Sequence, residues 1–77
     1  MRSRYSARYR RFLKRLRAAR LEADLTQVAV AGALNRPQSF VSKCESGERR
    51  VDVIELGDFA RLYRKPIKFF LSGDEPA

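Results

Sequence analysis

Two short apolar patterns separated by a tight turn occupy the middle of this chain, between residues 26 and 47. Thr26 can cap a first helix, and Asn35 can end it, because Asn tolerates the left-handed backbone that a tight turn demands. Pro37 suits the first position of a second helix, and Gly47 supplies its stop. The spacing therefore predicts two short helices that cross at a steep angle.

Each of the two predicted helices has an apolar side. In the first helix it is formed by Val28, Val30, Ala31 and Leu34. In the second it is formed by Phe40, Val41 and Cys44, at positions i, i+1 and i+4. The polar side chains of the second helix then face outward, and they are Gln38, Ser39, Ser42, Lys43 and Ser46. Ala31 is small enough to let the second helix approach the backbone of the first closely.

This pattern resembles the helix-turn-helix of the phage repressor and Cro group, also called the Xre family of bacterial regulators. The resemblance is carried by Gln27 at the start of the first helix, Ala31 at the small position, the turn at Asn35, and Glu45 followed by Gly47. It extends from about residue 16 to residue 71. It implies an all-α, compact five-helix, lambda-repressor-like DNA-binding domain with an extended basic first helix.

The chain divides into three parts on this reading. Residues 1–8 form a basic N-terminal arm or helix extension, and residues 73–77 form a disordered tail. Residues 9–72 form the helix-turn-helix domain, with the helix-turn-helix at 26–47 and the recognition helix at about 37–46. Asp52 and Glu55 give a capping-box start to a further helix. Its predicted core face is Val53, Ile54, Leu56, Phe59, Ala60, Leu62 and Tyr63.

A last short helix is predicted to open at Pro66 and to stop near Gly73. Its apolar side chains are Ile67, Phe69, Phe70 and Leu71. We assign the last three to the core, with a dimer surface as the alternative.

Positive charge is concentrated at the start of the chain. Nine of the 17 basic side chains and none of the nine acidic ones lie in residues 1–20, and the formal net charge is +8. The same segment carries an apolar stripe at helical spacing, Tyr5, Tyr9, Phe12, Leu13 and Leu16. A basic segment of this kind predicts a nucleic-acid partner. A solvated helix face and a membrane-surface helix are the alternatives.

Residue roles follow from the chemistry of base edges and from the resemblance. Gln38 can donate to and accept from adenine at once. The resemblance adds further base contacts at Ser39, Ser42 and Lys43. Phosphate contacts are expected from Gln27, Arg36, Arg49, Arg50, Arg2, Arg4 and Arg8. Gln27 is also expected to brace Gln38, and the arm either enters the minor groove or adds phosphate contacts. The resemblance further implies a structural ion pair between Arg20 and Glu45.

The sequence offers no candidate catalytic or metal-binding residues. The sequence has no histidine and a single cysteine, so neither a zinc site nor a Ser-His or Cys-His pair is indicated, and we expect no enzyme activity and no cofactor. Cys44 is expected to be a packed thiol, with a redox sensor as the alternative. No run of about 18 apolar residues and no signal-peptide core occurs, so we expect a cytoplasmic protein without membrane contact.

The resemblance and the charge together predict a sequence-specific, double-stranded DNA-binding transcriptional regulator, with repression as the expected effect. A homodimer on a palindromic operator is one arrangement, and no small-molecule ligand is evident. Two alternatives remain open: an antitoxin or adaptor module that binds a protein partner through the same fold, and a basic RNA or lipid surface binder.

Overall fold

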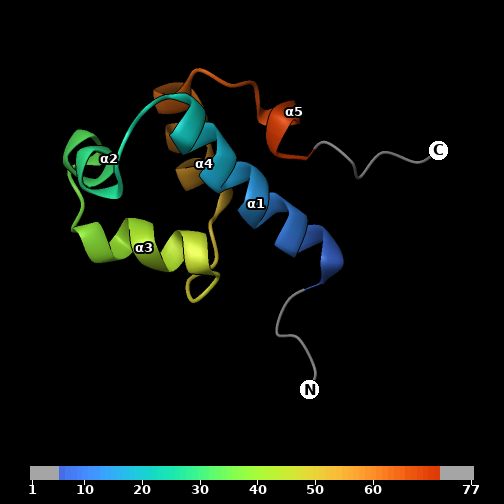
Figure 1. Ribbon diagram of the computed structural model, residues 1–77. Coiled ribbons are helices and arrows are strands. Elements are labelled where there is room, and N and C mark those ends of the chain that lie inside the picture. The colour runs from blue at the N-terminus through green and yellow to red at the C-terminus, as the bar shows by residue number, and fades with distance from the viewer. Residues whose placement is uncertain (1–5, 72–77) are drawn as a thin grey trace.

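The computed structural model describes residues 6–71, which form five α-helices and no strand (Figure 1). The helices are α1 (Ala7–Glu22), α2 (Gln27–Leu34), α3 (Gln38–Ser46), α4 (Val53–Tyr63) and α5 (Ile67–Phe70). In the view of Figure 1, α1 runs diagonally across the molecule, α3 lies along the lower edge, and α5 lies at the upper right. The expected all-α, five-helix fold is confirmed.

The first helix begins two residues before the expected domain boundary. Ser6 caps it, because its hydroxyl accepts a hydrogen bond from the backbone N–H of Tyr9 at 3.1 Å. Arg8 therefore lies inside the first turn of α1. Arg2, Arg4 and Tyr5, together with the predicted tail at 73–77, lie outside the described residues.

The caps of α2 and α4 are those expected from the sequence. The Thr26 hydroxyl accepts from the N–H of Ala29 at 3.0 Å. The Asp52 carboxylate accepts from the N–H of Glu55 at 2.8 Å, and the Glu55 carboxylate accepts from the N–H of Asp52 at 3.1 Å. This reciprocal pair is a capping box, so the predicted start of α4 is confirmed.

Each predicted helix start at a proline lies one residue too early. Pro37 and Pro66 have extended backbones, with ψ of 153° and 154°, and stand as N-caps just before α3 and α5. The predicted recognition helix α3 therefore begins at Gln38. The backbone N–H groups of its first turn, which have no partner within the helix, lie at Gln38 and the residues that follow it.

Left-handed backbone conformations end three of the helices. Asn35 (φ 57°, ψ 46°) ends α2 and Gly47 (φ 86°, ψ 0°) ends α3, both as expected. Arg64 (φ 58°, ψ 44°) ends α4, and Asp24 (φ 61°) lies in the turn after α1; neither was anticipated. These conformations cost more for side chains other than Gly, Asn and Asp. At Arg64 the conformation lets the backbone close α4, where the N–H of Lys65 donates to the carbonyl of Ala60 at 3.0 Å.

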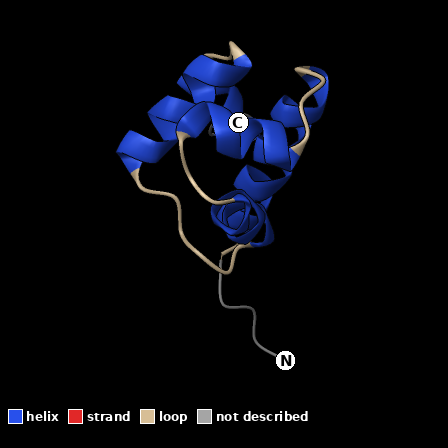
Figure 2. Ribbon diagram, turned by 90° about the vertical axis from the view of Figure 1, so that its left-hand side faces the viewer, coloured by secondary structure: helices blue, strands red, loops and turns tan. Residues whose placement is uncertain are grey.

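All five helices contribute to one hydrophobic core, around which they pack with loops at the periphery (Figure 2). Its buried members are Phe12, Leu16, Ala19, Val30, Ala31, Phe40, Val41, Cys44, Phe59, Ala60, Tyr63 and Phe70. The assignments of Cys44 and Phe70 to the core are confirmed, and Phe69 is half-buried against it. Burial raises the pKa of the Cys44 thiol.

Four apolar side chains expected in the core are exposed instead. Val53 and Ile54 lie in the first turn of α4, and they are 76% and 72% exposed. The carboxylate of Glu55 takes the inward position there. Val28 is 68% exposed because it precedes the buried Val30 by two residues, about 200° around the helix. Leu71 follows the end of α5 and is 45% exposed.

Candidate nucleic-acid interface

The turn between α2 and α3 is closed by backbone hydrogen bonds. The N–H of Arg36 donates to the carbonyl of Ala31 at 2.9 Å, and the N–H of Asn35 donates to the carbonyl of Gly32 at 3.2 Å. These bonds satisfy two of the carbonyls left free at the end of α2. Ala31 is only 4% exposed, and its methyl group leaves room for α3 to cross α2 closely.

Helix α3, the predicted recognition helix, has one buried and one solvent-facing side. Its buried side chains are Phe40, Val41 and Cys44. Gln38, Ser39 and Lys43 are exposed, and Ser42 is half-buried. The structure thus brings the four expected base-contact residues together on the outward side of a two-turn helix.

A chain of side-chain hydrogen bonds runs from the start of α3 to the protein interior. The amide nitrogen of Gln38 donates to the Oε1 of Gln27 at 3.0 Å. The amide nitrogen of Gln27 donates in turn to the Oε1 of Glu45 at 3.0 Å. Gln27 therefore braces Gln38, as the sequence suggested, and its own orientation is fixed by a buried carboxylate.

Arg20 anchors the interior end of this chain. Its Nε donates to Glu45 at 2.6 Å and its Nη2 donates to the other carboxylate oxygen at 3.1 Å. Its Nη1 donates to the carbonyl of Leu25 at 3.0 Å. The side chains of Arg20 and Glu45 are only 9% and 6% exposed, so the ion pair implied by the resemblance is present and buried. The hydrogen bond to Glu45 raises the pKa of Arg20.

The hydroxyl of Tyr63 lies in the same interior region. It is buried and has no hydrogen-bond partner among residues 6–71. Burial is the main cause of the raised pKa of Tyr63, and the negative charge of Glu45 adds to it. A buried hydroxyl without a hydrogen-bond partner costs free energy.

A second ionic cluster, which the sequence did not reveal, is centred on Glu55. Its carboxylate accepts from both terminal nitrogens of Arg49, at 2.7 and 2.8 Å, and lies 3.6 Å from Arg36. The hydrogen bond from Arg49 is the main reason why the pKa of Glu55 lies below its ordinary value of 4.5. The capping-box pattern at Asp52 and Glu55 was the one sequence feature that pointed to Glu55, and it gave no sign of the two arginines.

The same two arginines lie over the ring of Phe40. The guanidinium carbons of Arg36 and Arg49 are 4.2 and 4.9 Å from the ring centroid, within the range of cation–π attraction. Both side chains, expected to bind phosphate, are engaged by the protein itself. They are still 42% and 41% exposed, so part of each guanidinium faces solvent.

The loop after α3 is tied to the first turn of α1. The hydroxyl of Tyr9 accepts from the N–H of Val51 at 3.0 Å, and the guanidinium of Arg50 lies 4.2 Å from the centroid of the Tyr9 ring. Arg8 and Arg50 both line a pocket of about 310 Å³ between these elements. Two expected phosphate contacts from distant parts of the chain are thereby brought to one place.

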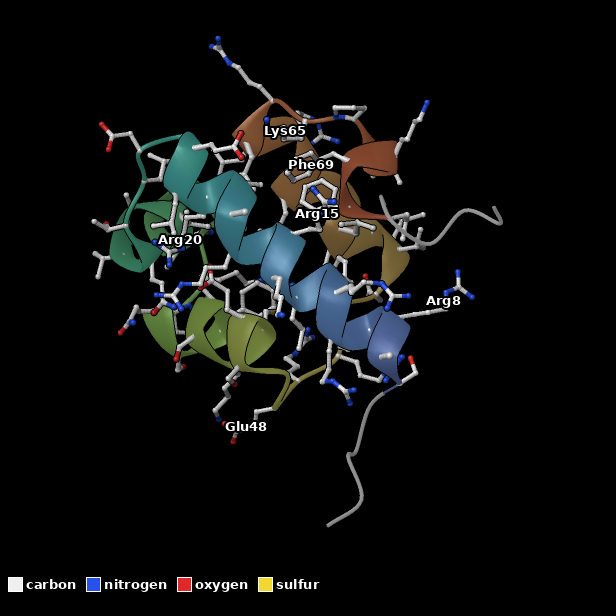
Figure 3. All side chains as sticks on the ribbon, turned by 45° about the vertical axis from the view of Figure 1, so that its right-hand side comes forward. Arg8, Arg15, Arg20, Glu48, Lys65 and Phe69 are labelled. Carbon is white, nitrogen blue, oxygen red and sulfur yellow. The ribbon has the colours of Figure 1, made fainter. Side chains whose placement is uncertain are left out.

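Another group of basic side chains helps to dock α5. Arg15 and Lys65 lie over the ring of Phe69, at 5.4 and 4.6 Å from its centroid (Figure 3). Lys65 also pairs with Glu22 of α1 at 2.7 Å. Positive charge on this side of α1 therefore has a role in packing.

Within residues 6–71, no helix is long and apolar enough to cross a membrane. The same range holds no group of three or more Asp, Glu, Cys or His side chains placed to bind a metal ion.

Comparison with known proteins places the chain in a family. Searches of curated proteins and of solved structures gave no match. A family model described as a helix-turn-helix domain matches residues 9–66, which covers all of α2, α3 and α4 and most of α1. This range contains both ionic clusters and the hydrogen bonds that hold Gln38. The chain belongs to the helix-turn-helix domain family.

Proposed function

We propose that this protein is a sequence-specific transcriptional regulator of the phage repressor and Cro type, which binds double-stranded DNA with α3 in the major groove. The observation that carries the proposal is the braced position of Gln38. Its amide stands exposed at the start of α3 and is held by Gln27, which is itself held by Glu45. A side chain ordered before binding loses less conformational entropy when it meets its target.

The chemistry of the braced amide suits adenine. One N–H of Gln38 is used by Gln27, which leaves the second N–H and the carbonyl oxygen without another hydrogen bond among residues 6–71. Adenine offers the N7 acceptor and the N6 donor in the major groove, which is the matching pair. Ser39, Ser42 and Lys43 follow on the same outward side, and Lys43 suits the acceptors of guanine.

Phosphate contacts complete the proposed interface. Gln27 opens α2, where the free N–H groups of the helix favour an anion. Arg36, Arg49 and Arg50 flank α3 and retain exposed guanidinium surface, and Arg8 lies near Arg50 across the pocket. Arg2 and Arg4 belong to the same proposal as arm contacts. Deleting residues 1–5, which spares the Ser6 cap, should weaken binding to all sequences alike and flatten its salt dependence.

Two copies on a palindromic operator are part of the proposal. A nine-residue helix spans about 13 Å, which matches about four base pairs at 3.4 Å each. A sequence of about four base pairs occurs too often in a genome to specify a single binding site. Two copies with half-sites about 34 Å apart would double the sequence that is read. Repression requires only that the pair occupies its operator.

Selection from random DNA followed by footprinting tests the proposal. We expect a palindromic motif, and the absence of any enriched motif would overturn the reading of a specific regulator. Gln38→Ala should then cost about 1 to 3 kcal/mol on the selected site and relax the preference at one base pair. Glu48→Ala, in the loop that follows α3, is the control and should leave the preferred sequence unchanged.

An antitoxin or adaptor module is the second candidate. The adjacent Val53 and Ile54 side chains at the start of α4 favour it, because exposed apolar groups of this size suit a protein contact. A motif that survives Val53→Ser and Ile54→Ser would support DNA binding by the domain itself. Capture of a defined protein partner without any DNA motif would support the module instead.

A further inference from the structure

A groove lies on the side of α1 that faces the recognition helix. It has a volume of about 280 Å³ and is lined by Arg17, Arg20, Gln27, Ser42, Glu45 and Ser46. These residues come from α1, from the first residue of α2 and from the middle and end of α3. The groove is therefore continuous with the surface on which Gln38 and Gln27 stand.

Arg17 is the cation of this groove that the fold does not use. It is exposed and makes no ion pair, hydrogen bond or aromatic contact within residues 6–71. By contrast, Arg20 is bound to Glu45, and Arg15 lies over Phe69 on another side of the helix (Figure 3). A long charged side chain that serves no packing role here is available to a ligand.

The position of Arg17 follows from helix geometry. It precedes Arg20 by three residues, so the two share a side of α1. Arg20 reaches Glu45 on α3, and Ser42 precedes Glu45 by three residues on that helix. Because α1 and α3 run in opposite directions (Figure 1), Arg17 stands one turn from Arg20 toward the C-terminal end of α3, where it lines the groove with Ser42 and Ser46.

The charge of the groove favours an anion. The carboxylate of Glu45 accepts hydrogen bonds from Arg20 and from Gln27, so its negative charge is compensated within the protein. Arg17 then leaves the groove with a net positive charge. The amide of Gln27 and the start of α2 add N–H dipoles at its edge.

We infer that this groove holds a backbone phosphate of the bound DNA, with Arg17 as the contact that the sequence did not reveal. This inference rests on the proposed function. A helix in the major groove, which is about 12 Å wide, has a sugar-phosphate strand on each side. The groove includes Gln27 at the start of α2, so a strand bound at that helix start is the one that we expect to reach Arg17.

Salt-dependent binding of matched variants tests this role. Arg17→Gln and Arg15→Gln remove the same charge from the same helix, two residues apart. Dissociation constants would be measured by fluorescence anisotropy on the selected duplex and on a scrambled duplex, at several salt concentrations. Circular dichroism melting would confirm that each variant is folded.

For Arg17→Gln we expect the slope of log K against log salt to fall in magnitude by about 0.9, the value for one phosphate contact. The loss of affinity between about 50 and 200 mM salt then becomes about 3.5-fold smaller than in the wild type. Affinity should fall by the same factor on both duplexes. Arg15→Gln should leave the slope unchanged, and Arg17→Lys should restore it, because lysine carries the same charge.

Equal slopes for Arg17→Gln, Arg15→Gln and the wild type would overturn the inference and leave the proposed function standing. A change of base preference in Arg17→Gln would overturn it too, because a phosphate contact reads no sequence. Failure of the wild-type protein to bind any duplex would instead refute the proposed function on which the inference rests.

Discussion

Glu55 accepts hydrogen bonds from both terminal nitrogens of Arg49, at 2.7 and 2.8 Å. The same carboxylate accepts from the N–H of Asp52 and lies 3.6 Å from Arg36. One buried acid thus caps α4 and holds two arginines of the loops on either side of α3. The geometry of those loops depends on the charge of Glu55.

Acid should weaken the fold through Glu55. Its pKa in the folded protein lies below its ordinary value of 4.5, chiefly because of Arg49, so the folded state binds fewer protons there than the unfolded state. The resulting stability is fully present above pH 4.5 and is lost as the pH falls through the lowered pKa. Urea unfolding from pH 7 to pH 3 should show this loss, and Glu55→Gln should flatten it. Glu48→Gln, at an exposed acid with no ion pair among residues 6–71, should leave the acid-induced loss of stability as it is in the wild type.

Removing Glu45 should destabilise the protein strongly. Glu45→Ala leaves the Arg20 guanidinium buried without its partner, which costs about 3 to 5 kcal/mol for a pair of this burial. Thermal or urea unfolding measures the change. Glu48→Ala removes an exposed acid three residues later and should stay within about 0.5 kcal/mol of the wild type. An unchanged melting temperature in Glu45→Ala would mean that the pair does not form in solution.

The two tyrosine hydroxyls of the described core should behave differently. Tyr63→Phe removes a buried hydroxyl that has no partner among residues 6–71, so stability should stay the same or rise. Tyr9→Phe removes the acceptor of the Val51 N–H and should cost about 1 kcal/mol. Both are measured by urea unfolding. A larger loss in Tyr63→Phe than in Tyr9→Phe would contradict the arrangement.

Gln27 and Gln38 should act as a unit in DNA binding. If Gln27 positions the amide of Gln38, the double variant Gln27→Ala with Gln38→Ala should lose less affinity than the sum of the single losses. We expect a coupling free energy of about 0.5 to 3 kcal/mol on the selected duplex. Strictly additive losses would show that the 3.0 Å hydrogen bond has no role in recognition.

Local patterns determined much of what the sequence could predict. Thr26, Asn35 and Gly47 mark helix ends through backbone preferences that need no tertiary contact, and each lies where it was expected. The Arg20–Glu45 pair joins residues 25 positions apart, and only the resemblance to a known family suggested it. Whether Ser39, Ser42 and Lys43 contact bases stays a prediction.

The apolar side chains that were wrongly assigned to the core lie at its edges. Val53 and Ile54 match an apolar helix pattern, but the first turn of α4 turns a carboxylate inward instead, because that carboxylate finds three partners there. Whether an apolar or an acidic side chain turns inward here depends on the arginines in the loops on either side of α3. The periodicity of α4 alone contains no information about those loops. The sequence also could not single out Arg17 as the arginine without a contact in the protein. Its neighbours Arg15 and Arg20 have the same side chain and differ only in the residues opposite them, Phe69 and Glu45.

The three-way contact of Arg20 has a consequence for how such a protein could change its target. This side chain on α1 binds the carbonyl of Leu25 ahead of α2 and the carboxylate of Glu45 on α3. The tilt of the recognition helix is thereby set from a helix that is expected to touch no base. Substitutions beneath the surface, around Arg20, could therefore retune which base pairs are preferred while every side chain that reads them stays the same.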